Sequence, residues 1–497
     1  MDVIDALPGI VVFAYLAIAL GVGFVAGRRG GGGTSDFVAG ERAFGPVVMY
    51  FVMGATVFSA FALLGTPQRV VSRGADVFYI LAFGSVGFVP MFFFGPRVRR
   101  IGAREGYVTQ AELLGARFQS RLVTTVMGIA TVAAFIPYLV IQLKGAGIVM
   151  EAAVGWDRTV GAAVVYAVVV AYVVVGGMRG VGWTNVLQGV VMIVVVWILG
   201  LWIPRALYGG VAPMLDIVVA TRPEYLTLPG PASHPTSLFK YSSEVLVSVL
   251  GFTMWPQVFM KSFTARSARL VQLSVVVYPT FLFFLVPLIF LGYAALLQPG
   301  APQDETVLLW IVRLPELGAG PLAFSFVCFA VLAASMSTGD ALLHGGGSIF
   351  VRDVLVVGFG ARLEDRQQTR AMRVVIVVMG ALGLLLLEAT ARISIVDLLL
   401  LAYAVPIQFV PLTLLGLYWR RANRAGAEWG LCSGLAAVIL LFTLMQLAPE
   451  RYAQLNPLGL QIGVIGLLLN LGVMIALSLA LPSMAKSHLK RFIRAAD

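Results

Sequence analysis

The sequence predicts an all-α polytopic membrane protein, a single transmembrane domain over residues 1–497, and three observations carry this prediction. Of the 497 residues, 59% are hydrophobic and 12% are charged, and the mean hydropathy is +0.93. Apolar segments near the ~20 residues that a helix needs to cross a bilayer recur along the whole chain. The basic residues gather in alternate connections between these segments. Such a composition excludes a soluble catalytic module.

Thirteen apolar segments are long enough to be membrane-spanning helices. The inner connections between them hold 25 of the 35 Lys and Arg residues and the outer connections hold nine, as the positive-inside rule predicts. An odd number of spans puts the two ends on opposite sides, so we expect the N-terminus outside and the C-terminus inside the plasma (cytoplasmic) membrane. The charge distribution also explains the net charge of +11 without nucleic acid. The approximate limits are 9–27, 45–67, 77–96, 122–151, 157–178, 182–204, 242–260, 270–297, 321–351, 372–388, 392–418, 427–448 and 460–481.

The second and seventh spans are interrupted in comparable ways. The second contains Gly54 and then Gly65-Thr66-Pro67, and the seventh runs from Gly251 to Pro256 and Gln257. Glycine and proline at membrane depth free backbone groups that need other partners. Two interrupted helices five spans apart are typical of transporters built from inverted repeats around a site at the midplane. The alternative is that both are ordinary kinks.

The ninth span contains the polar stretch Ser337-Thr338-Gly339-Asp340. An isolated charge at bilayer depth costs at least a few kcal/mol, so these groups indicate a polar partner inside the membrane. We interpret the stretch as half of a cation site in a secondary transporter. The alternative is that the hydroxyls bond back to the preceding turn of their own helix.

Five segments, in order along the chain, resemble the motifs of one family. They are residues 54–67, 183–189, 251–257, 336–340 and 408–411. Together they resemble the sodium:solute symporters, which include proline, pantothenate, monocarboxylate and sugar transporters. The resemblance implies a LeuT-type core of two inverted five-helix repeats, residues 45–204 and 242–418, with broken first and sixth core helices. Residues 9–27 would be an extra N-terminal helix, and residues 427–481 would form two C-terminal helices.

The resemblance also implies a sodium site. Its ligands would be the backbone carbonyls of Ala55, Phe58 and Ala334 and the hydroxyls of Ser337 and Thr338. Half-helix ends and unwound backbone supply such oxygens to a cation. The chain departs from many relatives by carrying Val57 and Asn185 where they carry carboxylates, so a second sodium ion, or proton coupling, at Asn185 is not expected.

The same resemblance implies which residues would contact the solute and which would couple its movement to that of the cation. In this fold the solute lies beside the two broken helices. The solute-binding or gating candidates are Thr56, Val57, Gln142, Lys144, Thr253, Trp255, Tyr403 and Gln408. The coupling candidates are Asn185, Gln188, Asp340 and His344.

Lys144 is the one Lys or Arg that is assigned to no connection, because it lies well inside the fourth predicted span, and two interpretations of it stay open. Its ammonium could bind the carboxylate of a solute as a point charge. In a LeuT-type core it could instead pair permanently with Asp340. His344 lies four residues after Asp340 and therefore on the same helix face, which favours a polar vestibule or a proton-handling pair. We expect the glycines at 345–347 to allow close helix packing.

These observations predict a symporter that uses a cation gradient, most simply sodium, to import a small organic solute by alternating access. Lys144 favours a carboxylate such as a monocarboxylate or a pantothenate-like acid. The alternatives are a proline-type amino acid or a sugar, a proton-coupled or uncoupled variant, and, less well supported, a channel or receptor. No enzymatic activity and no organic cofactor are expected. The expected partners are the anionic solute and the bilayer, and a monomer would suffice.

Overall fold

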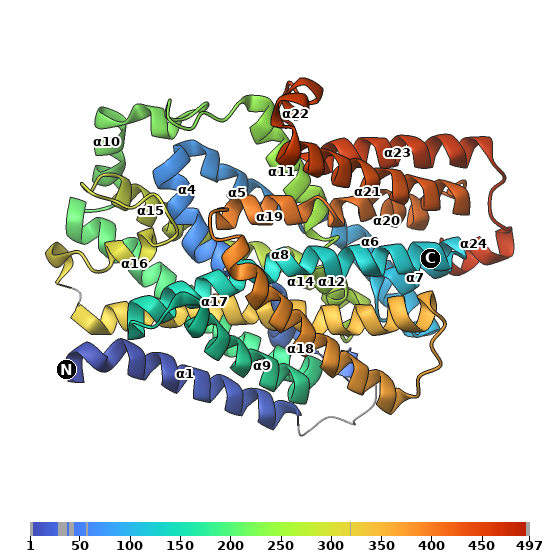
Figure 1. Ribbon diagram of the computed structural model, residues 1–497, viewed down its shortest axis with the longest axis horizontal. Helices are drawn as coiled ribbons and strands as arrows, with labels where there is room; N and C mark the ends of the chain where they lie inside the picture. The colour runs from blue at the N-terminus through green and yellow to red at the C-terminus, as the bar shows by residue number, and fades with distance from the viewer. Residues whose placement is uncertain (1–2, 28–36, 39–43, 56–57, 319, 494–497) are drawn as a thin grey trace.

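The computed structural model describes residues 3–27, 37–38, 44–55, 58–318 and 320–493. Most of them are helical, and within these ranges there is one isolated β-bridge, between Phe44 and Ala265, and no named strand. The long helices run roughly along the longest axis of the molecule (Figure 1). α10 and α16 lie at one end of this bundle, and α7 and α24 lie at the other.

The helices have the following bounds: α1 Val3–Gly27, α3 Pro46–Ala55, α4 Thr66–Arg73, α5 Phe78–Val86, α6 Val89–Glu105, α7 Gln110–Phe118, α8 Arg121–Val154, α9 Arg158–Tyr208, α10 Val211–Thr221, α11 Leu238–Phe252, α12 Pro256–Phe259, α13 Lys261–Thr264, α14 Ala268–Leu282, α15 Leu285–Leu296, α16 Val307–Ile311, α17 Gly320–Ile349, α18 Asp365–Ala389, α19 Ile395–Tyr403, α20 Phe409–Tyr418, α21 Arg424–Leu447, α22 Pro449–Leu455, α23 Ile462–Ala480 and α24 Lys486–Phe492. Short π-helices at Phe61–Gly65 and Phe350–Gly358 extend α4 and α17.

Within the described ranges, ten helical segments are long and apolar enough to cross a membrane, or eleven if the bent pair α11 and α12–α13 is one span. Two of them are too long for one crossing. α9 has 51 residues, about 75 Å at 1.5 Å per residue, and it is broken at Gly177, where φ is 51° and ψ is −150°. The segment Phe61–Glu105 is broken at Gly74, where φ is 62°. The predicted count of thirteen spans and the division into two repeats stay predictions.

Both predicted interruptions are present. α3 ends at Ala55, and the described residues Phe58 and Ser59 have no regular structure before the chain becomes helical again at Ala60 and in the π-helix from Phe61. α11 ends at Phe252, and the chain then bends by 42° into α12 and α13. Ring packing and small residues hold these breaks. A Cβ at Gly251 would lie 2.8 Å from the ring of Tyr403, and one at Gly54 would lie 2.4 Å from the ring of Phe281.

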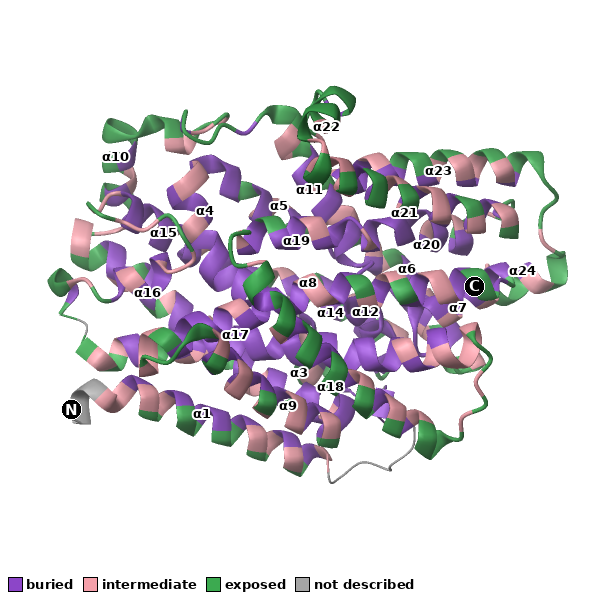
Figure 2. Cartoon of the chain, viewed as in Figure 1, coloured by how far each residue is buried: buried purple, intermediate pink, exposed green. Residues whose placement is uncertain are grey.

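α17 is the central helix of the bundle. It packs against α1, α8, α9 and α18. In the most apolar stretch of the segment Gly320–Gly358, 78% is buried inside the protein. In the most apolar stretches of α21 and α18, only 28% and 33% are buried, so these two helices face lipid. Figure 2 shows the same division between a buried interior and exposed outer faces. The predicted close packing at 345–347 is confirmed, because a Cβ at Gly346 would lie 2.4 Å from Met379 on α18.

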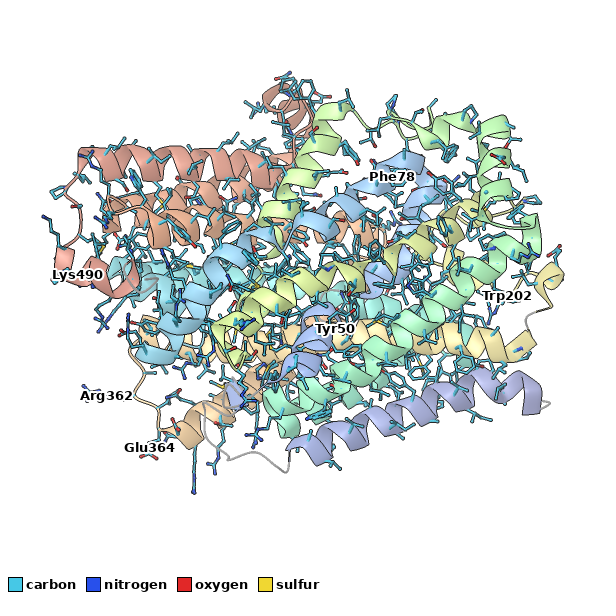
Figure 3. All side chains as sticks on the ribbon, turned by 180° about the vertical axis from the view of Figure 1, so that it is seen from behind. Tyr50, Phe78, Trp202, Arg362, Glu364 and Lys490 are labelled. Atoms are coloured by element: carbon cyan, nitrogen blue, oxygen red, sulfur yellow. The ribbon has the colours of Figure 1, made fainter. Side chains whose placement is uncertain are left out.

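Charged and amphipathic side chains mark the two ends of the bundle. In Figure 3, Arg362, Glu364 and Lys490 lie at one end and Trp202 lies toward the other. The first of these ends also carries Arg117, whose Nη2 donates to the carbonyl of Ala422 over 3.3 Å. This separation agrees with a bundle whose ends emerge on opposite sides of a bilayer.

Candidate functional site

The break after α3 is held open by α8. The backbone N–H of Ala60 donates to Oε1 of Gln142 over 3.0 Å, and Nε2 of Gln142 donates to the carbonyl of Tyr138 over 3.2 Å. α8 can approach so closely because Gly145 has no side chain, and a Cβ there would lie 2.4 Å from Cβ of Ala60. Gln142, predicted to contact the solute, thus uses its amide to stabilise the broken helix.

Three of the predicted sodium ligands come together at this break. Oγ of Ser337 lies 2.9 Å from the carbonyl oxygen of Ala55 and 3.0 Å from that of Ala334. A serine hydroxyl has one hydrogen, so it satisfies one carbonyl at a time. The contact with Ala334, three residues earlier in α17, is the bond to the preceding turn that the alternative interpretation predicts, whereas the contact with Ala55 reaches the broken helix.

The other predicted ligands are buried near these three. Phe58 follows the break and is 2% exposed, while Thr338 follows Ser337 and is fully buried. The ring of Phe58 packs against Phe281 and Phe284, with centroid distances of 5.1 and 4.2 Å. This packing fixes the backbone of Phe58. Thr56 and Val57, two of the solute candidates, lie outside the described residues.

Asp340 belongs to a separate buried cluster between α9 and α17. Its Oδ2 accepts hydrogen bonds from the hydroxyl of Tyr172 over 2.9 Å and from Thr184 over 3.2 Å. The ammonium of Lys261 interacts electrostatically with this carboxylate, whereas the amide of Asn185 has no partner in hydrogen-bonding geometry among the described residues. Asp340, Asn185 and Lys261 are all buried.

The predicted pair of Lys144 and Asp340 is wrong. Ser335 donates to the carbonyl of Gln142 over 2.7 Å, so these two residues lie at one level of the bundle. Lys144 is two residues from that level toward one end, and Asp340 is five residues from it toward the other. At 1.5 Å per residue they are about 10 Å apart along the helix axes.

The ammonium of Lys144 instead binds the connection between α18 and α19. Nζ donates to the carbonyls of Ala391 over 3.1 Å and Ile393 over 2.6 Å. These contacts hold the turn after the C-terminal end of α18, where a cation is favoured. Lys144 is half-buried and stabilises this turn, which is a structural role that neither earlier interpretation contained.

We expect Lys144→Met to lower the stability of the protein by about 1 kcal/mol, the usual net value of such hydrogen bonds. The apparent affinity for the solute should stay within about twofold. Thermal melts and uptake kinetics measure the two effects, with Lys240→Met as the charge-matched control near the same end. A tenfold loss of solute affinity at unchanged stability would restore the solute-binding interpretation.

His344 and Gln188 are fixed by partners on other elements. Nε2 of His344 lies 2.7 Å from the carbonyl oxygen of Phe37, so His344 and Asp340 share a helix face but not a partner. Nε2 of Gln188 donates to the hydroxyl of Tyr15 on α1 over 3.1 Å. Together these contacts join α1 and the segment before α3 to the central helices.

Gln408 faces away from the broken helices. Its Nε2 donates to the carbonyls of Ala404 and Gly463 over 3.1 and 3.0 Å, and its own carbonyl accepts from Asn470 over 2.8 Å. Its prediction as a solute contact is wrong, because α23 covers this face of the helix.

The break between α11 and α12 presents an aromatic cluster. The ring of Trp255 lies 5.0 Å from that of Tyr138 and 5.4 Å from that of Tyr403, measured between centroids. Within the described part of the chain, Oγ1 of Thr253, Nε1 of Trp255 and Oε1 of Gln257 are buried without a partner in hydrogen-bonding geometry. Buried polar atoms are almost always satisfied, so this cluster is the best candidate for contact with a polar solute.

Sequence reasoning missed a buried charge network that joins α4, the turn after it and α11. The guanidinium of Arg69 lies 2.5 Å from Asp76 and 3.0 Å from Glu244, and 3.8 Å from the half-exposed Asp397. Oδ2 of Asp76 also accepts from Thr236 over 2.5 Å. Arg69 was assigned to an outer connection, and the unexplained acid Glu244 in the seventh span was the signal that could have revealed its partner.

Comparisons with known proteins agree with this architecture. The chain is 29% identical over 484 residues, 95% of its length and 96% of the relative, to the uncharacterized symporter YhjB of Bacillus subtilis. It is 26% identical to the sodium/pantothenate symporter of Escherichia coli, covering 87% of this chain and 89% of that one. The solved structure of a Na⁺-coupled sialic acid symporter superposes with a TM-score of 0.79 at 18% identity, covering 96% and 98% of the two chains, and its likeness shows the fold. The family model "Sodium:solute symporter family" matches residues 37–434, so the chain belongs to this family of membrane transporters.

Proposed function

We propose that the protein couples the movement of sodium down its gradient to the uptake of a small organic solute that carries a carboxylate. The observation that carries the proposal is the approach of Oγ of Ser337 to the carbonyls of Ala55 and Ala334, at 2.9 and 3.0 Å. It joins a hydroxyl of the central helix to the carbonyl oxygen left free where α3 ends.

The chemistry of these groups suits sodium. Hard cations prefer oxygen ligands, and the proposed set consists of carbonyls and hydroxyls alone: Ala55, Phe58, Ala334, Ser337 and Thr338. The set spans two elements, the broken α3 and the unbroken α17. A cation held between them would favour the arrangement in which they are close, and this differential binding is what couples an ion to a conformational change.

A carboxylate solute is supported by the aromatic cluster and by the relatives. Nε1 of Trp255 can only donate a hydrogen bond, and the hydroxyl of Thr253 can donate as well. The relatives named for pantothenate and sialic acid carry solutes with a carboxylate. We therefore propose that Thr253 and Trp255 donate to an acceptor group of the solute, while Tyr138 and Tyr403 enclose it.

The coupling ion is proposed to be sodium rather than a proton. The amide of Asn185 does not take up a proton, and the carboxylate of Asp340 is held by Tyr172 and Thr184. The orientation is proposed from the basic residues: the end with Arg117 and α24 faces the cytoplasm and the end with α10 and α16 faces outward.

Uptake into proteoliposomes tests the proposal. The purified protein is reconstituted, a sodium or a proton gradient is imposed, and a panel of labelled monocarboxylates, pantothenate, proline and sugars is offered. We expect accumulation of a carboxylate only with an inward sodium gradient. Accumulation driven equally by a proton gradient, or indifferent to both gradients, would contradict sodium coupling.

A further inference from the structure

A basic pocket lies at the end of the bundle where α20 and α21 meet α24. Its volume is about 220 Å³. Four cationic side chains line it: Arg420 and Arg421 from the turn after α20, and Lys486 and Lys490 from α24. Leu489 and Ile493 add apolar surface, and no carboxylate is among the residues that line it.

Contacts on both sides hold the pocket in shape. Nε2 of His488 lies 2.9 Å from the carbonyl oxygen of Arg117, and Phe492 is fully buried, so α24 is docked rather than free. Nδ2 of Asn423 donates to the carbonyls of Leu477 and Leu481 over 3.1 and 3.3 Å. The four cations are therefore brought together by folded elements.

The cationic side chains of the pocket have no ion-pair partner among the residues that the structure describes. Within the described ranges, none of the two arginines and two lysines of the pocket forms an ion pair, although two arginines just outside the pocket do. Arg424 pairs with Glu428 over 2.7 Å, and Arg491 pairs with Glu105. Four like charges around one cavity repel each other, and an anion would relieve this repulsion.

Neighbouring residues indicate that this anion belongs to the membrane. Tyr418 and Trp429 are 45% and 65% exposed, and exposed aromatic side chains concentrate at the headgroup level of a bilayer. The guanidinium of Arg97 lies 4.4 Å from the ring of Tyr418. Ile493, which is partly exposed beside the pocket, offers apolar surface that an acyl chain needs and a free phosphate does not.

We propose that the basic pocket binds the phosphate headgroup of an anionic phospholipid. Arginine guanidinium groups bind phosphate oxygens in pairs, and lysines add point charges. Basic pockets between the ends of membrane helices bind such headgroups. The bound lipid links the turn between α20 and α21 to α24, and so stabilises the C-terminal helices against the rest of the bundle.

The test compares thermal stability of the full chain in detergent micelles containing phosphatidylglycerol or phosphatidylcholine. A ligand that binds the folded state raises its melting temperature, so phosphatidylglycerol should raise that of the wild type by several degrees over phosphatidylcholine. The double variant Arg420→Gln/Arg421→Gln should lose more than half of this rise. Arg366→Gln/Arg370→Gln on α18 removes the same charge from exposed positions outside the pocket and should keep it.

A second pair of substitutions and a comparison with soluble phosphates complete the test. If the arginine variant does not fold, Lys486→Gln/Lys490→Gln takes its place and should lose the rise in the same way. Inorganic phosphate and glycerol phosphate, added at matched concentration, should not reproduce the effect. An equal rise in the pocket and control variants, or an equal rise with a soluble phosphate, overturns the proposal of a lipid site.

Discussion

Ser337→Ala is expected to lower the apparent affinity for sodium by about 10- to 100-fold. The substitution removes the oxygen that lies between the carbonyls of Ala55 and Ala334. Hydrogen bonds and contacts to charged groups contribute about 1.5–3 kcal/mol, and each 1.4 kcal/mol is about tenfold in affinity. Initial uptake rates at graded sodium concentrations measure the effect.

Ser348→Ala is the matched control for this variant. Ser348 is also fully buried on α17, but its Oγ donates to the carbonyl of His344 in its own helix over 2.8 Å. It should leave the sodium dependence unchanged. If both variants keep the wild-type sodium affinity while the uptake remains sodium-driven, Ser337 is not a ligand.

The approach of Ser337 to Ala55 could be predicted because both halves leave marks in the sequence. The broken helix can be recognised by glycine and proline residues within an apolar segment. The hydroxyls can be recognised as polar residues in the middle of an apolar span. The resemblance then says which segments face each other. The structure brings Oγ of Ser337 to 2.9 Å from the carbonyl oxygen of Ala55, and the role of these atoms as sodium ligands stays a prediction.

The partners of Lys144, Asp340 and Gln408 could not be predicted in the same way. A pattern gives the face of a helix, but a contact also depends on depth along the bundle, and neighbouring helices run in opposite directions. Two residues each a few positions from a common level are thus separated by about 1.5 Å for every position. The face of Gln408 was in turn decided by α23, which lies outside the two predicted repeats.

Buried cations at the ends of spans were missed for a related reason. Counting the basic residues in the connections predicts the orientation of the protein in the membrane. The count does not say which basic side chains point into the bundle. Arg69 and Lys261 are 2% and 4% exposed. Asp76, one partner of Arg69, is only seven residues away, but the other buried partner, Glu244, comes from α11, and only the folded chain brings it to Arg69.

Arg69→Met is expected to destabilise the protein by about 3–5 kcal/mol, the usual cost of removing one partner of a buried ion pair. The substitution leaves Asp76 and Glu244, which are both fully buried, without their counter-charge. These residues belong to the turn after α4 and to α11, so the loss of stability should be greatest where these two elements meet. Thermal melts and protease resistance in detergent measure it.

Two further variants separate charge from packing at this network. Arg73→Met removes a charge one turn further along the same helix, at a side chain that forms no ion pair with a described residue, and it should change stability little. In the triple variant Arg69→Met/Asp76→Asn/Glu244→Gln the two orphaned charges are gone, and most of the lost stability should return because buried ion pairs add little over neutral groups of similar volume. A triple variant no more stable than Arg69→Met would mean that the guanidinium stabilises α4 through its packing on Tyr79, whose ring centroid lies 5.6 Å from it, and not through its charge.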